Sequence, residues 1–185
     1  MPFSGPGWVN QFPDSASTND LVEPFRTSCN RFIGALQAAG ATVAIDNTFR
    51  PRERAYLMHY CFRIARQRLD PATVPAMQGV NVQWVHRDAR GNPDLNASRR
   101  AAEQMVLGYN IAFQPALASR HTEGRAIDMA ITWRGNLAIA NANGGQTTIT
   151  TAPQSGENVA LHAVGAGYGV NKLVGDPPHW SSDGH

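Results

Sequence analysis

Two histidines and an aspartate, far apart along the chain, are of the types that bind a metal ion. His121 and Asp128 lie seven positions apart in the stretch SRHTEGRAIDM, and His179 comes near the end of the chain, in DPPHW. Asp128 stands between Ile127 and Met129, in an apolar run typical of a buried strand. A carboxylate in such a strand is destabilising unless a positive partner meets it. A zinc ion held by these three side chains would be that partner, with a fourth coordination position left open.

A further carboxylate lies close to this motif. Asp176 precedes His179 by three positions, and the two prolines between them stiffen the turn. A carboxylate held beside a zinc-activated water is placed as a general base needs to be. Glu53 and Glu123 are the other candidates for this role, and Glu123 lies in the loop that carries His121.

Taken together, these motifs resemble a family of zinc peptidases that cut peptidoglycan peptides. The family comprises D-Ala-D-Ala carboxypeptidases, D-Ala-D-Ala dipeptidases and L-alanyl-D-glutamate endopeptidases, and it includes many phage endolysins. The stretches SRHTEGRAIDM and DPPHW match its pattern closely, and TFRPRERAYL matches it more loosely. This resemblance is carried by short motifs, and their order along the chain is consistent with one whole domain.

The resemblance assigns a role to each residue of these motifs. It implies that His121, Asp128 and His179 bind zinc and that Asp176 is the catalytic base, where many members have Glu. It also implies that Arg50 stabilises the substrate carbonyl or the oxyanion. Ser119 occupies a motif position near the substrate.

The activity implied by the resemblance is that of a zinc metallopeptidase, a hydrolase. It would cut stem peptides of bacterial peptidoglycan by means of a zinc-activated water, as a carboxypeptidase or an endopeptidase. Two alternatives remain open: a non-catalytic zinc-containing module that binds peptidoglycan, and a zinc amidase that acts on a substrate outside the wall. The presence of both Asp176 and Arg50 favours catalysis, because a binding module needs neither a base nor an oxyanion partner.

Two further histidines have no assigned role. His185 is the last residue, where it could be a fourth ligand or a mobile end of the chain. His162 falls on an expected helix, from which it could orient a ligand.

The composition places the chain among folded globular proteins. Of 185 residues, 42% are hydrophobic and 16% are charged, which argues against disorder. The net charge of +2 suits an anionic partner such as the cell wall, but no basic run with interleaved aromatic residues indicates nucleic acid. No apolar run reaches the ~20 residues of a membrane span. Cys29 and Cys61 form no CxxC pair and are expected to be core residues.

The N-terminal stretch bears on where the protein acts. It has no Lys or Arg before Arg26 and no apolar core of the kind that a signal peptide has. We therefore expect synthesis in the cytoplasm, and action on the wall after lysis or through a dedicated secretion device. An endolysin and a bacteriolytic toxin both fit, and the toxin would have an immunity or delivery protein as a partner.

The elements that must position these residues follow from hydrophobic periodicity and turn residues. They favour an α+β fold with an irregular arm over 1–18 and one peptidase domain over 19–185, in which a small antiparallel sheet flanked by helices carries the zinc site at its edge. Helices are expected from a cap at Asn19 or Asp20 to Gly40, over 51–69, from a cap at Ser98 through Val106, and over 157–169. Strands are expected over 41–49, 80–86, 124–133, 137–141 and 147–152, with two more within 170–181.

Overall fold

Four α-helices and two antiparallel β-sheets make up the chain, which confirms the α+β class. The computed structural model describes all 185 residues. They form two compact units. The helical unit comprises Met1–Pro13 and Pro51–Ser119, and the sheet unit comprises Asp14–Arg50 and Arg120–His185. The two units alternate along the chain, and the expected boundary between the N-terminal arm and the peptidase domain, at residue 18, falls inside a segment of the sheet unit. A peptidase domain over 19–185 stays a prediction.

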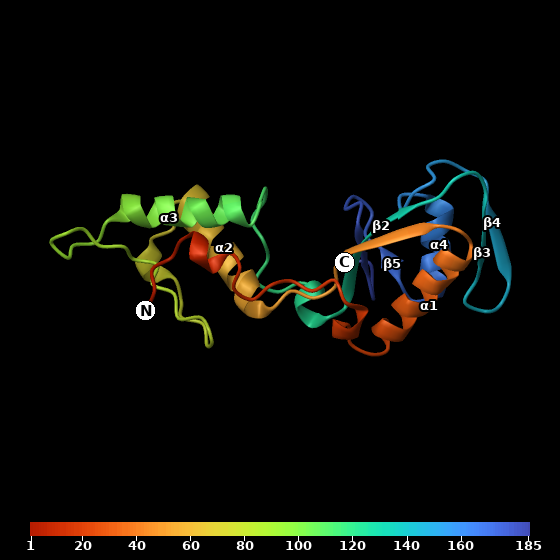
Figure 1. Cartoon of the computed structure of the whole chain (residues 1–185), viewed down its shortest axis with the longest axis horizontal. Helices are drawn as coiled ribbons and strands as arrows, with labels where there is room; N and C mark the ends of the chain where they lie inside the picture. Colours follow the sequence, from red (N-terminus) through yellow and green to blue (C-terminus); the bar gives the residue numbers. More distant parts are fainter. The chain divides into compact units, whose positions relative to one another are not determined.

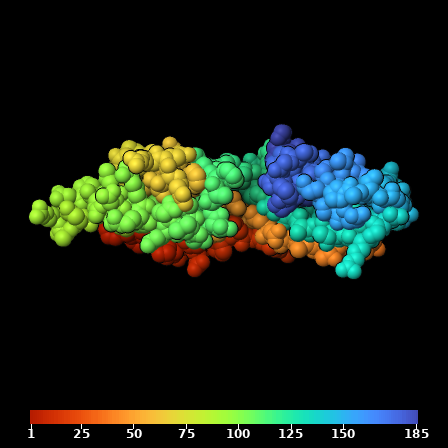
Figure 2. All heavy atoms as spheres, turned by 90° about the horizontal axis from the view of Figure 1, so that it is seen from above, coloured from red at the N-terminus to blue at the C-terminus, as the bar shows by residue number.

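Two helices dominate the helical unit. Helices α2 (Arg52–Arg66) and α3 (Leu95–Gly108) lie side by side in Figure 1. Their facing sides bury Cys61, Ile64 and Met105 in a common core. The first residues of the chain, red in Figure 2, lie along this unit, where the Tyr109 hydroxyl donates a hydrogen bond to the backbone oxygen of Trp8 at 3.0 Å.

The sheet unit is built on a four-stranded antiparallel sheet with the strand order β1-β2-β6-β5. Its strands are β1 (Thr42–Asn47), β2 (Ala126–Thr132), β6 (His179–Ser181) and β5 (Asn171–Lys172). A separate hairpin pairs β3 (Leu137–Ala140) with β4 (Gln146–Ile149). Strands β2 and β3 are therefore consecutive in sequence but belong to different sheets.

One face of the four-stranded sheet is covered by helices α1 (Phe25–Ala38) and α4 (Val159–Gly167), which lie together in Figure 1. Side chains alternate between the two faces of a strand. In β2, Ile127, Met129 and Ile131 are buried in the core that the helices share, whereas Asp128, Ala130 and Thr132 are half-buried or exposed. Asp128 therefore lies on the face that these helices do not cover.

Three expectations about local structure are corrected. The stretch 80–86 forms no β-strand and has only isolated bridges, such as Phe3 with Gln83. Its alternation of apolar and polar residues reflects the burial of Val80 and Trp84, and no strand lies beside it to pair with. Helix α1 begins at Phe25, after a short 3-10 turn over Thr18–Asp20. The sequence predicted a helix capped by Ser98, but helix α3 begins at Leu95. Its cap is Asp94, whose carboxylate accepts a hydrogen bond from the amide of Ala97.

The two cysteines are buried and unpaired, as expected of core residues. Burial raises the pKa of each thiol to about 12, so both remain protonated at neutral pH. No helix of the protein is both long and apolar enough to cross a membrane.

Helix α4 packs so closely on the sheet that one of its glycines has no room for a side chain. A Cβ at Gly165 would lie 2.8 Å from the Trp180 ring and 2.8 Å from the backbone oxygen of Val170. We expect Gly165→Ala to lower the free energy of unfolding by about 1–3 kcal/mol, because the helix must move away from the sheet. Gly167→Ala is the matched control in the same helix, since a Cβ there meets nothing within 4 Å. Urea unfolding of both variants measures the difference, and equal stabilities would contradict this account of the packing.

Candidate metal centre

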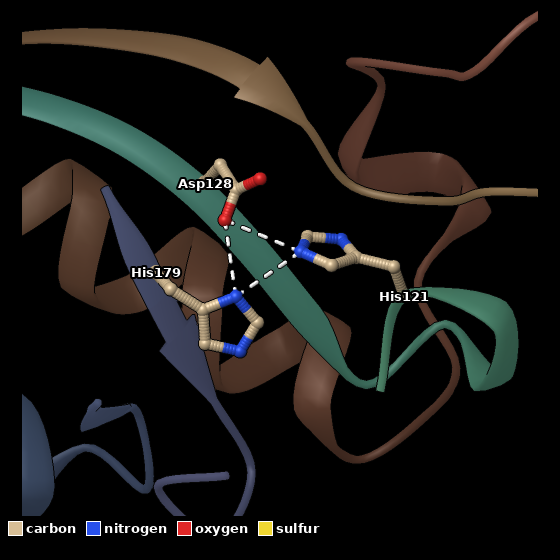
Figure 3. A group of neighbouring side chains, drawn as sticks. All are labelled: His121, Asp128 and His179. Atoms are coloured by element: carbon tan, nitrogen blue, oxygen red, sulfur yellow. Dashed lines mark hydrogen bonds and ion pairs between the residues drawn. The ribbon is translucent and has the colours of Figure 1, made fainter. Parts of the chain in front are cut away.

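His121, Asp128 and His179 meet on the face of the sheet that the helices leave open. His121 begins a short 3-10 turn just before β2, Asp128 lies within β2, and His179 is the first residue of β6. Strand pairing places Asp128 directly opposite His179. Figure 3 shows both imidazoles directed at the same carboxylate oxygen. The sequence predicted a site at the edge of the sheet. Strands β2 and β6 are instead the two inner strands, so Asp128 and His179 do not lie on an edge strand.

The three ligand atoms form a nearly equilateral triangle. The Nε2 atom of His121 lies 3.2 Å from Asp128 Oδ1 and 3.2 Å from His179 Nδ1, and the remaining side of the triangle is 3.1 Å. Tetrahedral coordination with bonds of ~2.0–2.2 Å separates ligand atoms by about 3.3–3.6 Å. A metal ion can therefore contact all three atoms after shifts of a few tenths of an ångström. The group can hold a metal ion, and two imidazoles with one carboxylate suit zinc as well as other first-row divalent ions.

The ionisation of the group follows from its burial and from the short contacts. Burial of Asp128 acts to raise its pKa, but the hydrogen bonds and charges of the two histidines outweigh burial and hold the pKa well below its usual range. Burial of His179 acts to lower its pKa, but the bond to Asp128, a bond to the backbone of His185 and the charges of Asp128 and Asp176 raise it above the ordinary value. The ionised form of Asp128 is the one that binds a metal ion, whereas a proton on His179 would compete with the ion for Nδ1.

Backbone contacts orient the two imidazoles. The Nε2–H group of His179 donates to the backbone oxygen of His185 at 3.1 Å, which leaves Nδ1 as the free lone pair toward the cluster. The Ser181 hydroxyl oxygen accepts the amide of His185 at 3.0 Å and so holds the chain end in place. His185 thus contributes through its backbone, whereas the sequence had left open a role as a fourth ligand. The Nδ1 atom of His121 is buried and has no hydrogen-bond partner.

Lys172, the only lysine of the chain, forms hydrogen bonds with the loop before His179. The side chain of Lys172 is 2% exposed, and its ammonium group donates to the backbone oxygens of Leu173 and Asp176. It also lies 3.5 Å from the carboxylate of Glu157 and 5.8 Å from the centre of the Trp180 ring. Because a lysine ammonium satisfies several carbonyls at once, this contact limits the conformations of the loop.

Asp176 lies in that loop and is exposed. Its backbone oxygen accepts the amide of His179 at 3.0 Å, which closes the turn. Its carboxylate makes no hydrogen bond or ion pair within the protein, although its charge contributes to the raised pKa of His179. A carboxylate without a partner of its own thus lies near enough to His179 to act on it through its charge.

The two other candidates for the base lie elsewhere. Glu123 is held in an ion pair with Arg120 at 2.7 Å, and Arg120 also pairs with Asp183. Glu53 belongs to helix α2, in the helical unit. Neither is a member of the cluster.

Arg50 is tied to the centre through its backbone, while its side chain has another partner. Its amide donates to the backbone oxygen of His121 at 3.2 Å. Its guanidinium pairs with Asp14 at 3.2 Å, and about a quarter of each side chain is exposed. Ser119 is the last residue of the helical unit, and its role near the substrate stays a prediction.

The remaining histidines have contacts outside the cluster. The ring nitrogen Nε2 of His162 bonds to the backbone oxygen of Gly156 at 2.9 Å, and the ring packs edge-on against Trp180 at 5.6 Å. His162 therefore supports the residue next to His179 and touches no ligand atom. The sequence contained no signal for this contact, because the two residues are distant in the chain.

The chain matches no model of a known protein family, and no curated protein sequence matches it. The likeness to zinc peptidases therefore depends on the short motifs alone. The possibility of a metal site depends instead on the geometry of three side chains.

Removal of one ligand should abolish metal binding. We expect His121→Ala and His179→Ala each to lose the bound ion, because two remaining ligands cannot hold it against dialysis. His59→Ala is a matched control, since His59 lies in the helical unit and bonds to the backbone of Pro115. Elemental analysis after dialysis against zinc gives the stoichiometry. A full equivalent of zinc in His121→Ala would show that other residues bind it.

Metal affinity should fall with acidity. A histidine must be neutral to bind a metal ion, and the raised pKa of His179 means that a proton competes for Nδ1 at a higher pH than for an ordinary histidine. Asp128, whose pKa is lowered, stays ionised over the same pH range and does not contribute to the pH dependence of metal affinity. Calorimetric titration with zinc from pH 8 to pH 5 should therefore show weaker binding at each lower pH, with proton release on binding. Affinity that is constant over this range would contradict the assignment.

Proposed function

We propose that this protein is a zinc-dependent peptidase that hydrolyses peptide bonds in the stem peptides of bacterial peptidoglycan. The convergence of three ligand atoms within 3.2 Å of one another, on an open face of a sheet, is the observation that carries the proposal. The carboxylate of Asp176 has no partner and acts on His179 through its charge, which supports hydrolysis rather than a purely structural metal. The motif resemblance supports the choice of substrate and a place of action at the cell wall, reached after lysis or secretion.

When bound, a zinc ion supplies a Lewis acid that polarises a carbonyl and makes a water molecule more acidic. His121, Asp128 and His179 would hold the ion, on the face of the sheet that helices α1 and α4 do not cover. Asp176 takes the proton from the attacking water and passes it to the leaving amine, as a general base and then a general acid. Its exposed position and its lack of a partner leave the carboxylate available for both steps.

Arg50 is the proposed partner of the negative charge that develops on the substrate oxygen. In the structure its guanidinium contacts Asp14, so the side chain must either leave Asp14 on substrate binding or use it as an anchor. A guanidinium has five donors, and a single carboxylate oxygen at 3.2 Å occupies only one of them. The pair thus still has donors to offer to a substrate.

The base assignment is tested by Asp176→Asn. We expect the variant to bind zinc like the wild type and to lose hydrolysis by roughly 10²–10⁴-fold, the usual contribution of a general base. Mass spectrometry of the products from purified peptidoglycan, with and without a chelator, measures the activity and identifies the bond that is cut.

Asp88→Asn is the control, because Asp88 is an exposed aspartate of the helical unit whose backbone contacts an asparagine can keep. Hydrolysis by Asp176→Asn at the wild-type rate would show that another group is the base. Binding to peptidoglycan that a chelator abolishes, with no product released, would favour a peptidoglycan-binding module.

A further inference from the structure

Two buried polar atoms in the region of the metal cluster have no hydrogen-bond partner. They are the ring nitrogen Nδ1 of His121 and the side-chain oxygen Oδ1 of Asn47. Both residues are more than nine-tenths buried, with 6% of His121 and 7% of Asn47 exposed. A buried polar atom without a partner is destabilising, and such atoms are rare in native proteins. Both atoms are therefore candidates for a contact that forms when the cluster binds a metal ion.

A bulge in β1 places Asn47 on the same face of the sheet as the cluster. Val43 and Ile45 pack against the core that the helices cover, so strict alternation would direct Asn47 toward that core as well. The strand pairing joins Ile45 to Met129. The next pair is Asn47 with Asp128, so β1 has one residue more than β2 at this point. Because paired residues of an antiparallel ladder direct their side chains to the same face, Asn47 shares the face of Asp128.

The ring of His121 reaches this end of β1 from the turn before β2. The backbone oxygen of His121 accepts the amide of Arg50, three residues after Asn47, at 3.2 Å. Its Nε2 atom lies 3.2 Å from Oδ1 of Asp128, the residue that pairs with Asn47. In Figure 3, Nδ1 lies on the side of the ring that faces the chain leaving β1. Paired residues have Cβ atoms about 5 Å apart, so the amide of Asn47 is within reach of a ring that contacts Asp128.

Metal binding decides which nitrogen of His121 carries the hydrogen. A nitrogen that binds a metal ion must present its lone pair, so the hydrogen of the neutral ring is on the other nitrogen. Nε2 is the atom of His121 that points into the cluster, so Nδ1 becomes a buried N–H group. Histidine ligands usually donate this second N–H to a carbonyl, a carboxylate or water. His179 donates to the backbone oxygen of His185 at 3.1 Å, whereas Nδ1 of His121 has no such acceptor.

We propose that Asn47 is a positioning residue of the metal centre: its Oδ1 accepts a hydrogen bond from Nδ1–H of His121 when Nε2 binds the metal ion. The bond gives both buried atoms a partner and fixes the ring in the tautomer that the ion requires. It forms by rotation of the amide about its last side-chain torsion, which has a broad energy minimum. The inference deepens the proposed function and rests on its metal centre, but it does not depend on hydrolysis.

Substitution of Asn47 tests this bond through zinc affinity. Asn47→Leu keeps the approximate size of the side chain but has no acceptor, so it should weaken zinc binding about 10- to 100-fold, the usual effect of losing such a partner. Asn47→Asp keeps an acceptor oxygen and should bind zinc at least as tightly as the wild type, because a carboxylate is the stronger acceptor. Asn81→Leu is the matched control, since Asn81 is an exposed asparagine of the helical unit. Competition with a fluorescent zinc chelator measures the affinities.

Thermal unfolding of the zinc-free proteins shows which variants are folded. Wild-type affinity in folded Asn47→Leu overturns the inference. An equal loss of affinity in folded Asn47→Asp also overturns it, because the shape of asparagine and not its acceptor would then be the cause. Zinc binding by the wild type without hydrolysis of peptidoglycan contradicts the proposed function alone, and the affinities of the variants still decide the role of Asn47. A wild type that binds no zinc contradicts both.

A second test needs no variant. In a crystal structure of the zinc-loaded wild type, Oδ1 of Asn47 should lie about 2.7–3.2 Å from Nδ1 of His121, the range of an N–H···O hydrogen bond. A water molecule or another acceptor on Nδ1, with the amide of Asn47 turned away, overturns the inference even where neither variant folds.

Discussion

The contact of one half-buried carboxylate with two imidazoles is the constraint on which the rest of the sheet unit depends. Asp128 lies in β2 between two core residues, and burial of its carboxylate without a partner would be destabilising. The two histidines at 3.1 and 3.2 Å remove that penalty, and they do so with three atoms that can all bind one metal ion. Strand pairing of Asp128 with His179 and the turn that begins at His121 are the means by which the fold brings them together.

The surroundings of the cluster restrict its movement from several sides. Lys172 holds the loop that contains Asp176, and the backbone of His185 orients the ring of His179. Behind them, Trp180 packs against Phe32 and His162, and the absence of a side chain at Gly165 lets helix α4 approach the ring. Ligands held this firmly lose little conformational entropy on metal binding, which is the condition for a preorganised site.

The two prolines before His179 have separate effects. They stiffen the turn between Asp176 and His179, so the proposed base keeps a fixed relation to a ligand. Pro178 also accepts a hydrogen bond from the amide of Met129 and has no N–H group with which to return one, so the ladder between β2 and β6 ends there. The rigid turn and the end of the ladder thus share a cause in the covalent structure of proline.

The sequence alone was sufficient to predict the α+β class, the buried cysteines and three residues that together could hold a metal ion, because these depend on periodicity and on the chemistry of single residues. It could not predict that 80–86 lacks a partner strand, that Glu123 pairs with Arg120 or that Arg50 pairs with Asp14, because these depend on which distant segments become neighbours. For the same reason only the tertiary structure placed Asp128 and His179 on the two inner strands, with His121 in the turn before β2. Which segments pair with a strand depends on the tertiary structure, and the residues of the strand itself do not specify them.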